Sequence, residues 1–226
     1  MKKASLKSYF WTLSLAVIFA VVTRFVLITA YKVPTGSMQP TLQPGDFIFA
    51  SKITYGILAL GSGWYVRWTQ PQRNEVVVFT YPDQPDTKYV KRVIGMAGDE
   101  IKIENDELWI NGKKVLYEEI VDQSENPNPE SFTIRNEIGP HGSRKVIQIK
   151  SSKAKRFGPL MIPEGQVFLL GDNRDASDDS RNWGTVPTEN VIAKVQMVWL
   201  SLDWQKKWAQ NRLPQVRWSR IFSRIY

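Results

Sequence analysis

The chain begins with a long apolar stretch. Residues 9–31 are mainly apolar, with Arg24 as their only charge, and three lysines lie among residues 1–8. A helix over this range is about 34 Å long, close to the thickness of the hydrocarbon layer of a bilayer. The pattern therefore predicts one N-terminal transmembrane helix over 9–31. The basic residues 1–8 are then cytoplasmic, and residues 32–226 form a domain on the outer side.

A cleaved signal peptide is the alternative, because it also places basic residues before an apolar core. Two features favour an uncleaved anchor. The stretch is long for such a core, and the candidate cleavage ends are unfavourable. Ala20 and Ala30 are preceded at the −3 position by Ile18 and Ile28, where a small side chain is usual. We therefore expect the segment to remain part of the protein.

After the apolar stretch, the pattern is one of short strands. Runs rich in β-branched and aromatic residues recur, with Gly, Pro, Asn or Asp near their ends. The runs lie at 47–50, 76–79, 89–94, 101–103, 131–135, 146–150, 166–170 and 193–200. Residues 107–110 and 113–115 flank Asn111-Gly112, which is typical of a two-residue hairpin. Sustained 3.6-residue periodicity is scarce here, so the pattern predicts a mainly β domain.

Two segments differ from this pattern in composition. Residues 117–163 are polar and contain the turn-rich run 125–130, which predicts a peripheral β subdomain inserted into the core. Residues 204–226 form a tail rich in Lys, Arg and Trp that contains no acidic residue. This tail either rests on anionic lipid headgroups or is a solvated basic segment, and the sequence leaves both open.

Composition limits the chemistry that the chain can perform. The net charge of +8 is compatible with nucleic acid, anionic lipid or an acidic partner, and does not choose among them. The chain has no cysteine, which excludes disulfides and thiolate metal sites. It has one histidine, His141. The usual bases of a catalytic serine or cysteine are thus nearly absent from this chain, which favours a base other than imidazole.

Ser37 is the candidate nucleophile. It lies in the segment 34–46, rich in Pro and Gly, shortly after the apolar stretch. Pro34 and Gly36 are turn formers that favour a tight, exposed loop on which a hydroxyl is presented. A serine in such a turn is most often an ordinary turn residue. If Ser37 is catalytic, the scarcity of histidine indicates a lysine base.

Lys91 is the candidate base. It is followed by Arg92 inside a predicted strand, so the two cations point to opposite faces. Lys91 is either a solvated charge on an edge strand or a buried amine. Burial disfavours the ammonium form and lowers its pKa from about 10.4, which allows a neutral amine to accept a proton from Ser37. The sequence leaves both interpretations open.

Residues 171–184 form a third polar segment, which follows the apolar run at 167–170. Its spacing does not fit a calcium loop of the EF-hand type. We expect a loop fixed by hydrogen bonds, in which Asp179 and Arg181 form an ion pair. Ser177 is a candidate for orienting a side chain such as Lys91.

Together these segments resemble a known family. The segments 34–46, 89–99 and 171–184, in this order after a membrane anchor, are similar to the sequence boxes of the type I signal peptidases, and 45–56 resembles a further box. The resemblance covers the anchor and most of the remaining chain except 117–163. It implies a mainly β, signal-peptidase-like core, and an endopeptidase that removes signal peptides after small residues (A-x-A) by acyl-enzyme chemistry.

The resemblance also implies a role for each residue. Ser37 is similar to the nucleophile of the family and Lys91 to its general base. The hydroxyl of Thr35 and the backbone N–H of Ser37 correspond to the oxyanion hole. Ser177 corresponds to a serine that bonds the lysine, and Asp179 and Arg181 to a supporting pair. The substrate pockets correspond to Val33, Met38, Leu42, Tyr89 and Val90.

The expected partners follow from the same resemblance. They are preproteins that carry signal peptides, the lipid bilayer and, as a further candidate, the protein-export translocon, with no nucleic acid. No metal or cofactor is expected. An extended substrate would add as a strand beside 88–91. The expected location is the bacterial cytoplasmic membrane, crossed once, with the catalytic domain on the outer side.

Two rival interpretations use the same features. A self-cleaving Ser/Lys regulator similar to the LexA-type repressors would share the β core, but the anchor and the lack of a helical DNA-binding segment argue against it. A membrane-tethered binding protein with a basic surface would not depend on the hydroxyl of Ser37. Cleavage of a preprotein separates these interpretations.

Overall fold

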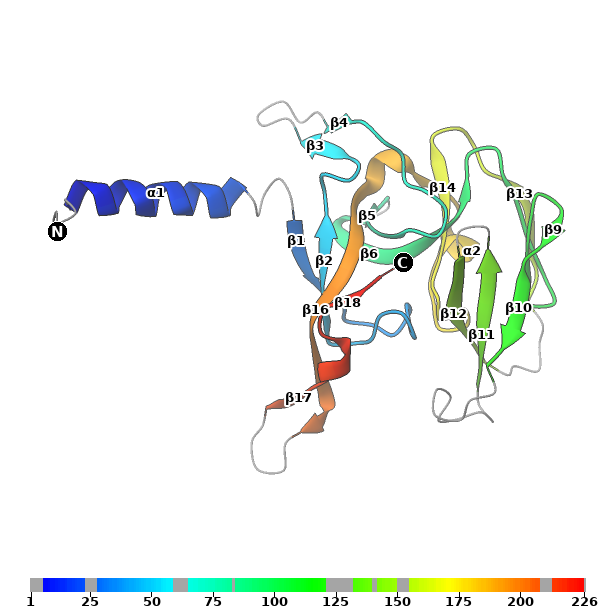
Figure 1. The fold of residues 1–226 in the computed structure, drawn as a ribbon. Coiled ribbons are helices and arrows are strands. Elements are labelled where there is room, and N and C mark those ends of the chain that lie inside the picture. Colours follow the sequence, from blue (N-terminus) through cyan, green and yellow to red (C-terminus); the bar gives the residue numbers. More distant parts are fainter. Residues whose placement is uncertain are drawn as a thin grey trace.

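A single curved sheet forms the centre of the fold (Figure 1). The computed structural model describes residues 6–22, 28–58, 65–82, 84–120, 132–139, 142–149, 155–207 and 213–225. Strands predominate among them, which confirms the prediction of a mainly β protein. The central strands run in the order β1-β2-β16-β5-β6-β14-β15, and β17 and β18 pair with β16. Each of these strands runs antiparallel to the strands with which it pairs.

The central strands include most of the predicted ones. Their bounds are β1 (Ile28–Lys32), β2 (Asp46–Ser51), β5 (Val76–Tyr81), β6 (Gln84–Met96), β14 (Gln166–Leu170), β15 (Val186–Pro187), β16 (Val191–Lys207), β17 (Pro214–Val216) and β18 (Ser223–Arg224). Strand β16 is longer than predicted. It pairs with four other strands, and shifts in register accompany its bend across the sheet (Figure 1).

Apolar side chains fill both sides of this sheet, because successive residues of a strand point to opposite faces. In β5, Val76 and Val78 pack into one buried cluster, whereas Val77 and Phe79 pack into another. The first cluster also contains Met38 and residues of β2 and β16. The loop that carries Ser37 is therefore anchored in the core.

Two of the smaller sheets lie at the end of the molecule opposite the N-terminal helix (Figure 1). Strands β7 (Glu100–Glu104), β8 (Glu107–Ile110), β9 (Lys113–Lys114) and β13 (Phe157–Met161) form one, and β10 (Leu116–Glu119), β11 (Phe132–Gly139) and β12 (Gly142–Ile149) form another. Strands β3 (Gly56–Leu58) and β4 (Tyr65–Arg67) pair with each other. The predicted hairpin is confirmed, since β8 pairs with β9 and Asn111 and Gly112 have φ of 53° and 72°.

The N-terminal segment differs from its prediction. Helix α1 (Leu6–Val22) projects from the domain (Figure 1), and Ile28–Lys32 is the strand β1. A helix over the whole of 9–31 was therefore the wrong expectation, because the main chain of residues 28–31 pairs with β2. Within the described ranges, no helix combines the length and the apolar character needed to cross a membrane.

The basic tail folds back onto the sheet as far as it is described. After β17 come the short helix η3 (Trp218–Arg220) and β18. Arg220 Nη2 donates to the buried carboxylate of Asp46 at 2.5 Å, and Arg217 Nε donates to Ser201 at 2.8 Å. Residues 213–225 are thus part of the domain, and two of the basic side chains of the tail are occupied in holding it there.

Candidate active site

Ser37 lies on the loop between β1 and β2, and its surroundings fix the loop at both ends. Hydrogen bonds from Val33 N to Asp46 O (2.8 Å) and from Gly45 N to Val33 O (2.9 Å) close the base of the loop. The side chains of Met38 and Leu42 are buried beneath it. Apolar anchors on one side of the loop therefore leave the hydroxyl of Ser37 on the other side, where it is partly exposed.

A second loop holds the main chain of the Ser37 loop from the opposite side. Asn173 N donates to Ser37 O at 3.1 Å, and Asn173 Nδ2 donates to Gly36 O at 3.2 Å. The approach is close, since a Cβ atom at Gly171 would lie 2.5 Å from Ser37 O. Only a residue without a side chain allows this contact.

Lys91 occupies β6 with its amine against Ser37. The residue is 2% exposed, and Lys91 Nζ donates a hydrogen bond to Ser37 Oγ at 2.8 Å. Of the two interpretations that the sequence left open, the structure therefore selects the buried amine. The two residues are separated by 54 positions in the chain, and the sheet order β1-β2-β16-β5-β6 brings the loop of Ser37 and the strand of Lys91 into one structure.

The environment of Lys91 favours its neutral form. Burial lowers the pKa of Lys91 from 10.5 to about 8, against the opposing effect of the carboxylates of Asp179, Asp178 and Asp172. The charge of Arg181 acts in the same direction as burial. A fraction of the amine is therefore unprotonated near neutral pH, and in that form it can accept the proton of Ser37 Oγ.

Thr35 lies beside the hydroxyl of Ser37. Its Oγ1 is 3.4 Å from Ser37 Oγ, and the residue is exposed. The hydroxyl is thus on the same side of the loop as the candidate nucleophile and is accessible to a ligand.

Asp179 and Arg181 form the predicted ion pair. Arg181 Nε and Nη2 each donate to the buried carboxylate of Asp179 at 2.7 Å, in a bidentate arrangement. The same carboxylate accepts from Gly171 N at 3.0 Å and caps the short helix α2 (Ser180–Trp183). Asp179 therefore ties the polar loop to the end of β14.

Ser177 does not form the hydrogen bond to Lys91 that the resemblance implies. Lys91 makes its hydrogen bond to Ser37, and the buried hydroxyl of Ser177 has no hydrogen-bond partner within the described residues. The side chain nevertheless lies in the site, because a Cβ atom at Gly171 would be 2.2 Å from Ser177 Oγ. The tight packing over Gly171 fixes the place of this side chain without a bond to the lysine.

Sequence reasoning missed a buried ion pair next to the site. Arg92 Nε donates to Asp172 Oδ1 at 2.8 Å and Arg92 Nη2 to Asp172 Oδ2 at 2.7 Å, with both side chains 1% exposed. Thr41 Oγ1 also donates to Asp172 Oδ2. The sequence offers two signs of this pair. Two cations are adjacent in a predicted strand, and an acid follows the apolar run 167–170 after a single glycine.

Asp172 remains charged in spite of its burial. Burial alone raises the pKa of Asp172, but the charge and hydrogen bonds of Arg92, the Thr41 hydroxyl and the charge of Arg144 together hold it below its usual value. Because Arg92 follows Lys91 and Asp172 precedes Asn173, this one pair connects the strand of the candidate base to the loop that holds Ser37.

The residues predicted to bind substrate fall into two groups. Val33, Met38 and Leu42 are buried in one apolar cluster, against which Val90 packs. Tyr89 packs in the other cluster, with its ring 6.0 Å from that of Phe79.

Strand β6 has one open edge beside these residues. Strand β5 pairs with β6 from Gln84 to Arg92, whereas β14 pairs only with residues from Arg92 to Met96. No described strand covers the second edge of β6 over 84–91. Main-chain groups are therefore available there, next to Lys91.

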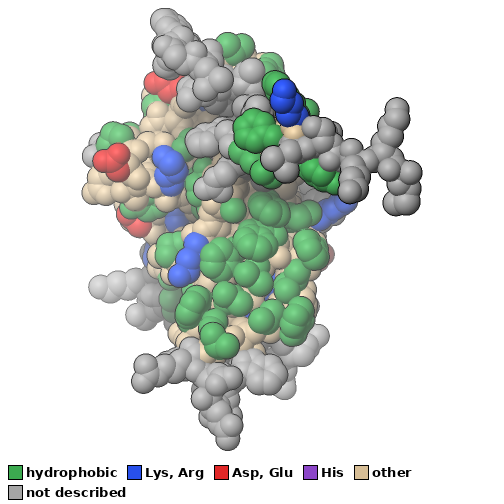
Figure 2. All heavy atoms as spheres, turned by 90° about the vertical axis from the view of Figure 1, so that its left-hand side faces the viewer, with side chains coloured by type: hydrophobic (Ala, Val, Ile, Leu, Met, Phe, Trp, Pro, Cys, Tyr) green, Lys and Arg blue, Asp and Glu red, His purple; other side chains and the backbone are tan. Residues whose placement is uncertain are grey.

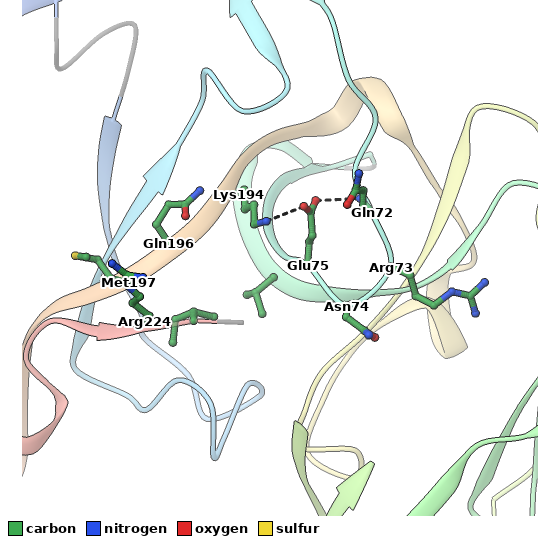
Figure 3. A pocket seen from close by; sticks show the side chains of 10 residues that line it. Gln72, Arg73, Asn74, Glu75, Lys194, Gln196, Met197 and Arg224 are labelled. Atoms are coloured by element: carbon green, nitrogen blue, oxygen red, sulfur yellow. Dashed lines mark hydrogen bonds and ion pairs between the residues drawn. The ribbon is translucent and has the colours of Figure 1, made fainter. Parts of the chain in front are cut away.

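A separate hollow lies on another part of the sheet (Figure 3). It has a volume of about 530 Å³ and is bordered by the ion pair between Lys194 and Glu75, whose atoms are 2.8 Å apart. None of the residues predicted for the site lines it.

Comparison with known proteins identifies the family. The family model described as signal peptidase, peptidase S26, matches residues 6–200. A signal peptidase I from Pseudomonas fluorescens is 35% identical over 230 residues, covering 95% of this chain and 76% of the relative. A signal peptidase I from Rickettsia typhi is 32% identical over 255 residues, covering 98% of this chain and 95% of the relative. The chain therefore belongs to the signal peptidase family, and it is a serine endopeptidase.

A solved structure gives a weaker similarity. A signal peptidase I from Enterococcus faecalis V583 shares 26% sequence identity, covering 56% of this chain and 97% of its own, with a TM-score of 0.35. The family assignment rests on the sequence matches.

The pair of Arg92 and Asp172 yields a prediction for stability. Asp172→Asn leaves the guanidinium buried without its counter-charge and is expected to lower the free energy of unfolding by about 3 kcal/mol. Glu107→Gln is the control, since Glu107 pairs with Lys114 at the surface and its loss is expected to change stability by less than about 1 kcal/mol. Denaturant unfolding measures both values.

The same variant has an expected pH dependence. The pKa of Asp172 is lowered in the folded protein, so its contribution is fully present at neutral pH and is lost as the pH falls through that lowered pKa. The difference in stability between wild type and Asp172→Asn therefore shrinks in acid. A difference that stays constant down to acid unfolding would contradict this account of the pair.

Proposed function

We propose that this enzyme removes signal peptides from preproteins by acyl-enzyme chemistry, with Ser37 as nucleophile and neutral Lys91 as general base. The observation that carries the proposal is the 2.8 Å contact between Lys91 Nζ and Ser37 Oγ at a lysine that is 2% exposed. A serine needs an adjacent base to become nucleophilic, and a desolvated amine supplies one. The names of the relatives support the substrate class.

The reaction proceeds in two stages. Neutral Lys91 accepts the proton of Ser37 Oγ as this oxygen bonds to the scissile carbonyl carbon. The protonated lysine then gives this proton to the nitrogen of the leaving peptide as the C–N bond breaks. In the second stage the same amine takes a proton from water, whose oxygen attacks the ester. Ser37 Oγ leaves and regains its proton, which completes the cycle.

The oxyanion of each stage is stabilised by the backbone N–H of Ser37 and the hydroxyl of Thr35. The support for Thr35 is its position 3.4 Å from Ser37 Oγ on the exposed side of the loop. The hydroxyl has to turn toward the substrate carbonyl to act in this way. Donors of this kind stabilise charge that develops only in the transition state.

The substrate binds as an extended strand along the open edge of β6 at 88–91. Main-chain hydrogen bonds align the scissile bond with Ser37, and small pockets give the preference for A-x-A sequences. Val33, Met38, Leu42 and Val90 line these pockets, with Tyr89 on the neighbouring side of the strand. Their location in or against one cluster beneath the Ser37 loop supports this assignment for the first four.

Ser177, Asp179 and Arg181 support the site without contacting substrate. Asp179 and Arg181 hold the turn at Gly171, which packs against Ser37 O. Ser177 fills the space above Gly171, next to the main chain of Ser37, and acts on the site through this packing. This role replaces the hydrogen bond that was expected from the sequence.

We further propose that the apolar N-terminal segment holds the enzyme on the cytoplasmic membrane, with residues 1–8 inside and the catalytic domain outside. Apolar side chains of α1 are exposed around the helix, namely Tyr9, Phe10, Trp11, Leu13, Leu15 and Val17. Figure 2 shows hydrophobic side chains gathered on the face from which α1 projects. The partners would then be preproteins, the bilayer and the export translocon.

Cleavage of a preprotein tests the catalytic pair. Wild-type enzyme is expected to release one signal peptide from the purified preprotein, whereas Ser37→Ala and Lys91→Arg are expected to be inactive, because arginine stays charged and cannot act as the base. Lys194→Arg serves as the control, since it alters a lysine that is paired with Glu75 away from the site. Product masses locate the cut. Cleavage by Lys91→Arg would contradict the role of Lys91 as the base. An enzyme that cuts its own chain and leaves the preprotein intact would favour a self-cleaving regulator.

The pH dependence of the rate tests the neutral amine. With the pKa of Lys91 at about 8, kcat/KM is expected to rise with pH below that value and to level off above it. The carboxylate of Asp178 raises this pKa, so Asp178→Asn is expected to move the midpoint to lower pH. A profile without a rise between pH 6 and 9 would be incompatible with Lys91 as the base.

Vesicle binding tests the membrane contacts. The full chain is expected to float with vesicles of anionic phospholipid, and Leu13→Lys combined with Val17→Lys is expected to reduce flotation. Trp218 and Phe222 of the tail are 75% and 70% exposed, so replacing both by serine is expected to weaken it further. Leu116→Ser is the control, because this exposed residue lies in β10. Unchanged flotation of the Trp218 and Phe222 variant would show that the tail does not contact lipid.

A further inference from the structure

A buried carboxylate lies in the inserted sheet, and cations from two segments surround it. Glu137 of β11 is fully buried. The guanidinium groups of Arg144 and Arg174 contact its two carboxylate oxygens, and Tyr117 Oη donates to Glu137 Oε2 at 3.0 Å. Arg144 and Tyr117 belong to the inserted strands, whereas Arg174 belongs to the loop after β14 that holds Ser37.

Main-chain bonds join the same two segments. Ile147 N of β12 donates to Asp172 O at 2.9 Å, and Arg174 N donates to Ile147 O at 2.9 Å. Ile147 and Asn173 thereby form an isolated parallel bridge. The inserted hairpin thus holds residues 172–174 by its backbone and, through Glu137, by charge.

Residues 172–174 are the connection to the catalytic pair. Asn173 donates to the main chain of Gly36 and Ser37. Asp172 is bonded to Arg92, the neighbour of Lys91. Ser37 is therefore one hydrogen bond away from the segment that the insert holds, and Lys91 is linked to the same segment through its neighbour Arg92.

Asn74 provides a second connection. Its backbone oxygen accepts from Arg92 Nη1 at 2.6 Å, and its side-chain oxygen accepts from Arg144. Asn74 has φ of 75°, a left-handed conformation that asparagine tolerates. Figure 3 shows its side chain turned away from the pair of Glu75 and Lys194. One asparagine therefore contacts an arginine of the core and an arginine of the insert.

We propose that Glu137 is a positioning residue for the reaction, acting through Arg174 and Arg144 on the loop that fixes Ser37 and on the strand of Lys91. This inference rests on the catalytic roles proposed above for these two residues. It assigns the inserted sheet a part in aligning the site, whereas the sequence indicated only a peripheral subdomain.

The charge of Glu137 is what makes the arrangement stable. The guanidinium groups of the buried Arg92 and Arg174, and of Arg144, whose side chain is 9% exposed, share two buried carboxylates, from Asp172 and Glu137. Burial and the charges of Arg174 and Arg92 already lower the pKa of Arg144 to about 9. Without the charge of Glu137, two of these cations compete for Asp172, and residues 172–174 are expected to shift away from Ser37.

The test compares Glu137→Gln with wild type in the full chain, using a synthetic peptide that contains an A-x-A cleavage site. We expect kcat to fall about tenfold or more, since small displacements of a catalytic pair have effects of this size. The KM is expected to stay within about twofold, because the residues proposed to bind substrate do not contact Glu137. Glu119→Gln, an exposed position of the same sheet, is expected to match wild type.

A comparison of single and double variants distinguishes an effect on the position of the catalytic residues from a loss of folded protein. Asn173→Ala removes the side-chain bond to Gly36, so its effect on kcat is expected to be less than additive with that of Glu137→Gln. Circular dichroism at the assay temperature gives the folded fraction of each variant. Additive effects, or a lowered kcat that only follows the folded fraction, would overturn the proposal.

A milder variant covers the case in which Glu137→Gln does not fold. Tyr117→Phe removes only the hydroxyl, which donates to Glu137 at 3.0 Å and accepts from Arg174 Nη1 at 3.5 Å, and it is expected to lower kcat about threefold, in keeping with the loss of hydrogen bonds to charged groups. The inference would be overturned, and the proposed function kept, by a Tyr117→Phe variant with the wild-type kcat together with an inactive Ser37→Ala variant. Cleavage by Ser37→Ala would instead overturn the proposed function and, with it, the inference.

Discussion

The site depends on two neighbouring basic residues of β6, Lys91 and Arg92, which are both buried but have partners of different charge. Arg92 has a buried carboxylate as partner and stays charged, whereas Lys91 has a hydroxyl as partner and a lowered pKa. The alternation of a strand places them on opposite faces. Strand β6 thus carries a guanidinium that stays charged and an amine that loses its proton easily. The guanidinium of Arg92 anchors the strand that carries Lys91.

Much of the fold could be predicted from the sequence, because its strands have local signatures. The runs at 47–50, 76–79 and 166–170 became β2, β5 and β14, and the turn at Asn111-Gly112 joins two strands as expected. The end of the N-terminal helix was placed too late. Residues 28–31 are apolar enough for a helix, and only their pairing with the distant β2 makes them a strand.

The candidate site was predictable only in part. Ser37, Lys91, Asp179 and Arg181 lie together as the motifs indicated. The pairing of Arg92 with Asp172 could not be deduced, since the two residues are 80 positions apart and their local signs do not show which acid meets which cation. Glu137 was missed for the same reason. Its segment is polar in sequence, which is typical of a surface, whereas this carboxylate is buried among cations from β12 and from the loop after β14.

The open edge of β6 at 84–91 has a consequence for which proteins can be cut. Pairing with this edge requires a chain whose own backbone N–H and C=O groups are free. Residues inside a folded domain have already used these groups in their own helices and sheets. In the binding mode proposed above, the enzyme selects its substrates by conformation before any side chain is recognised, and the compact parts of folded proteins are protected without an inhibitor.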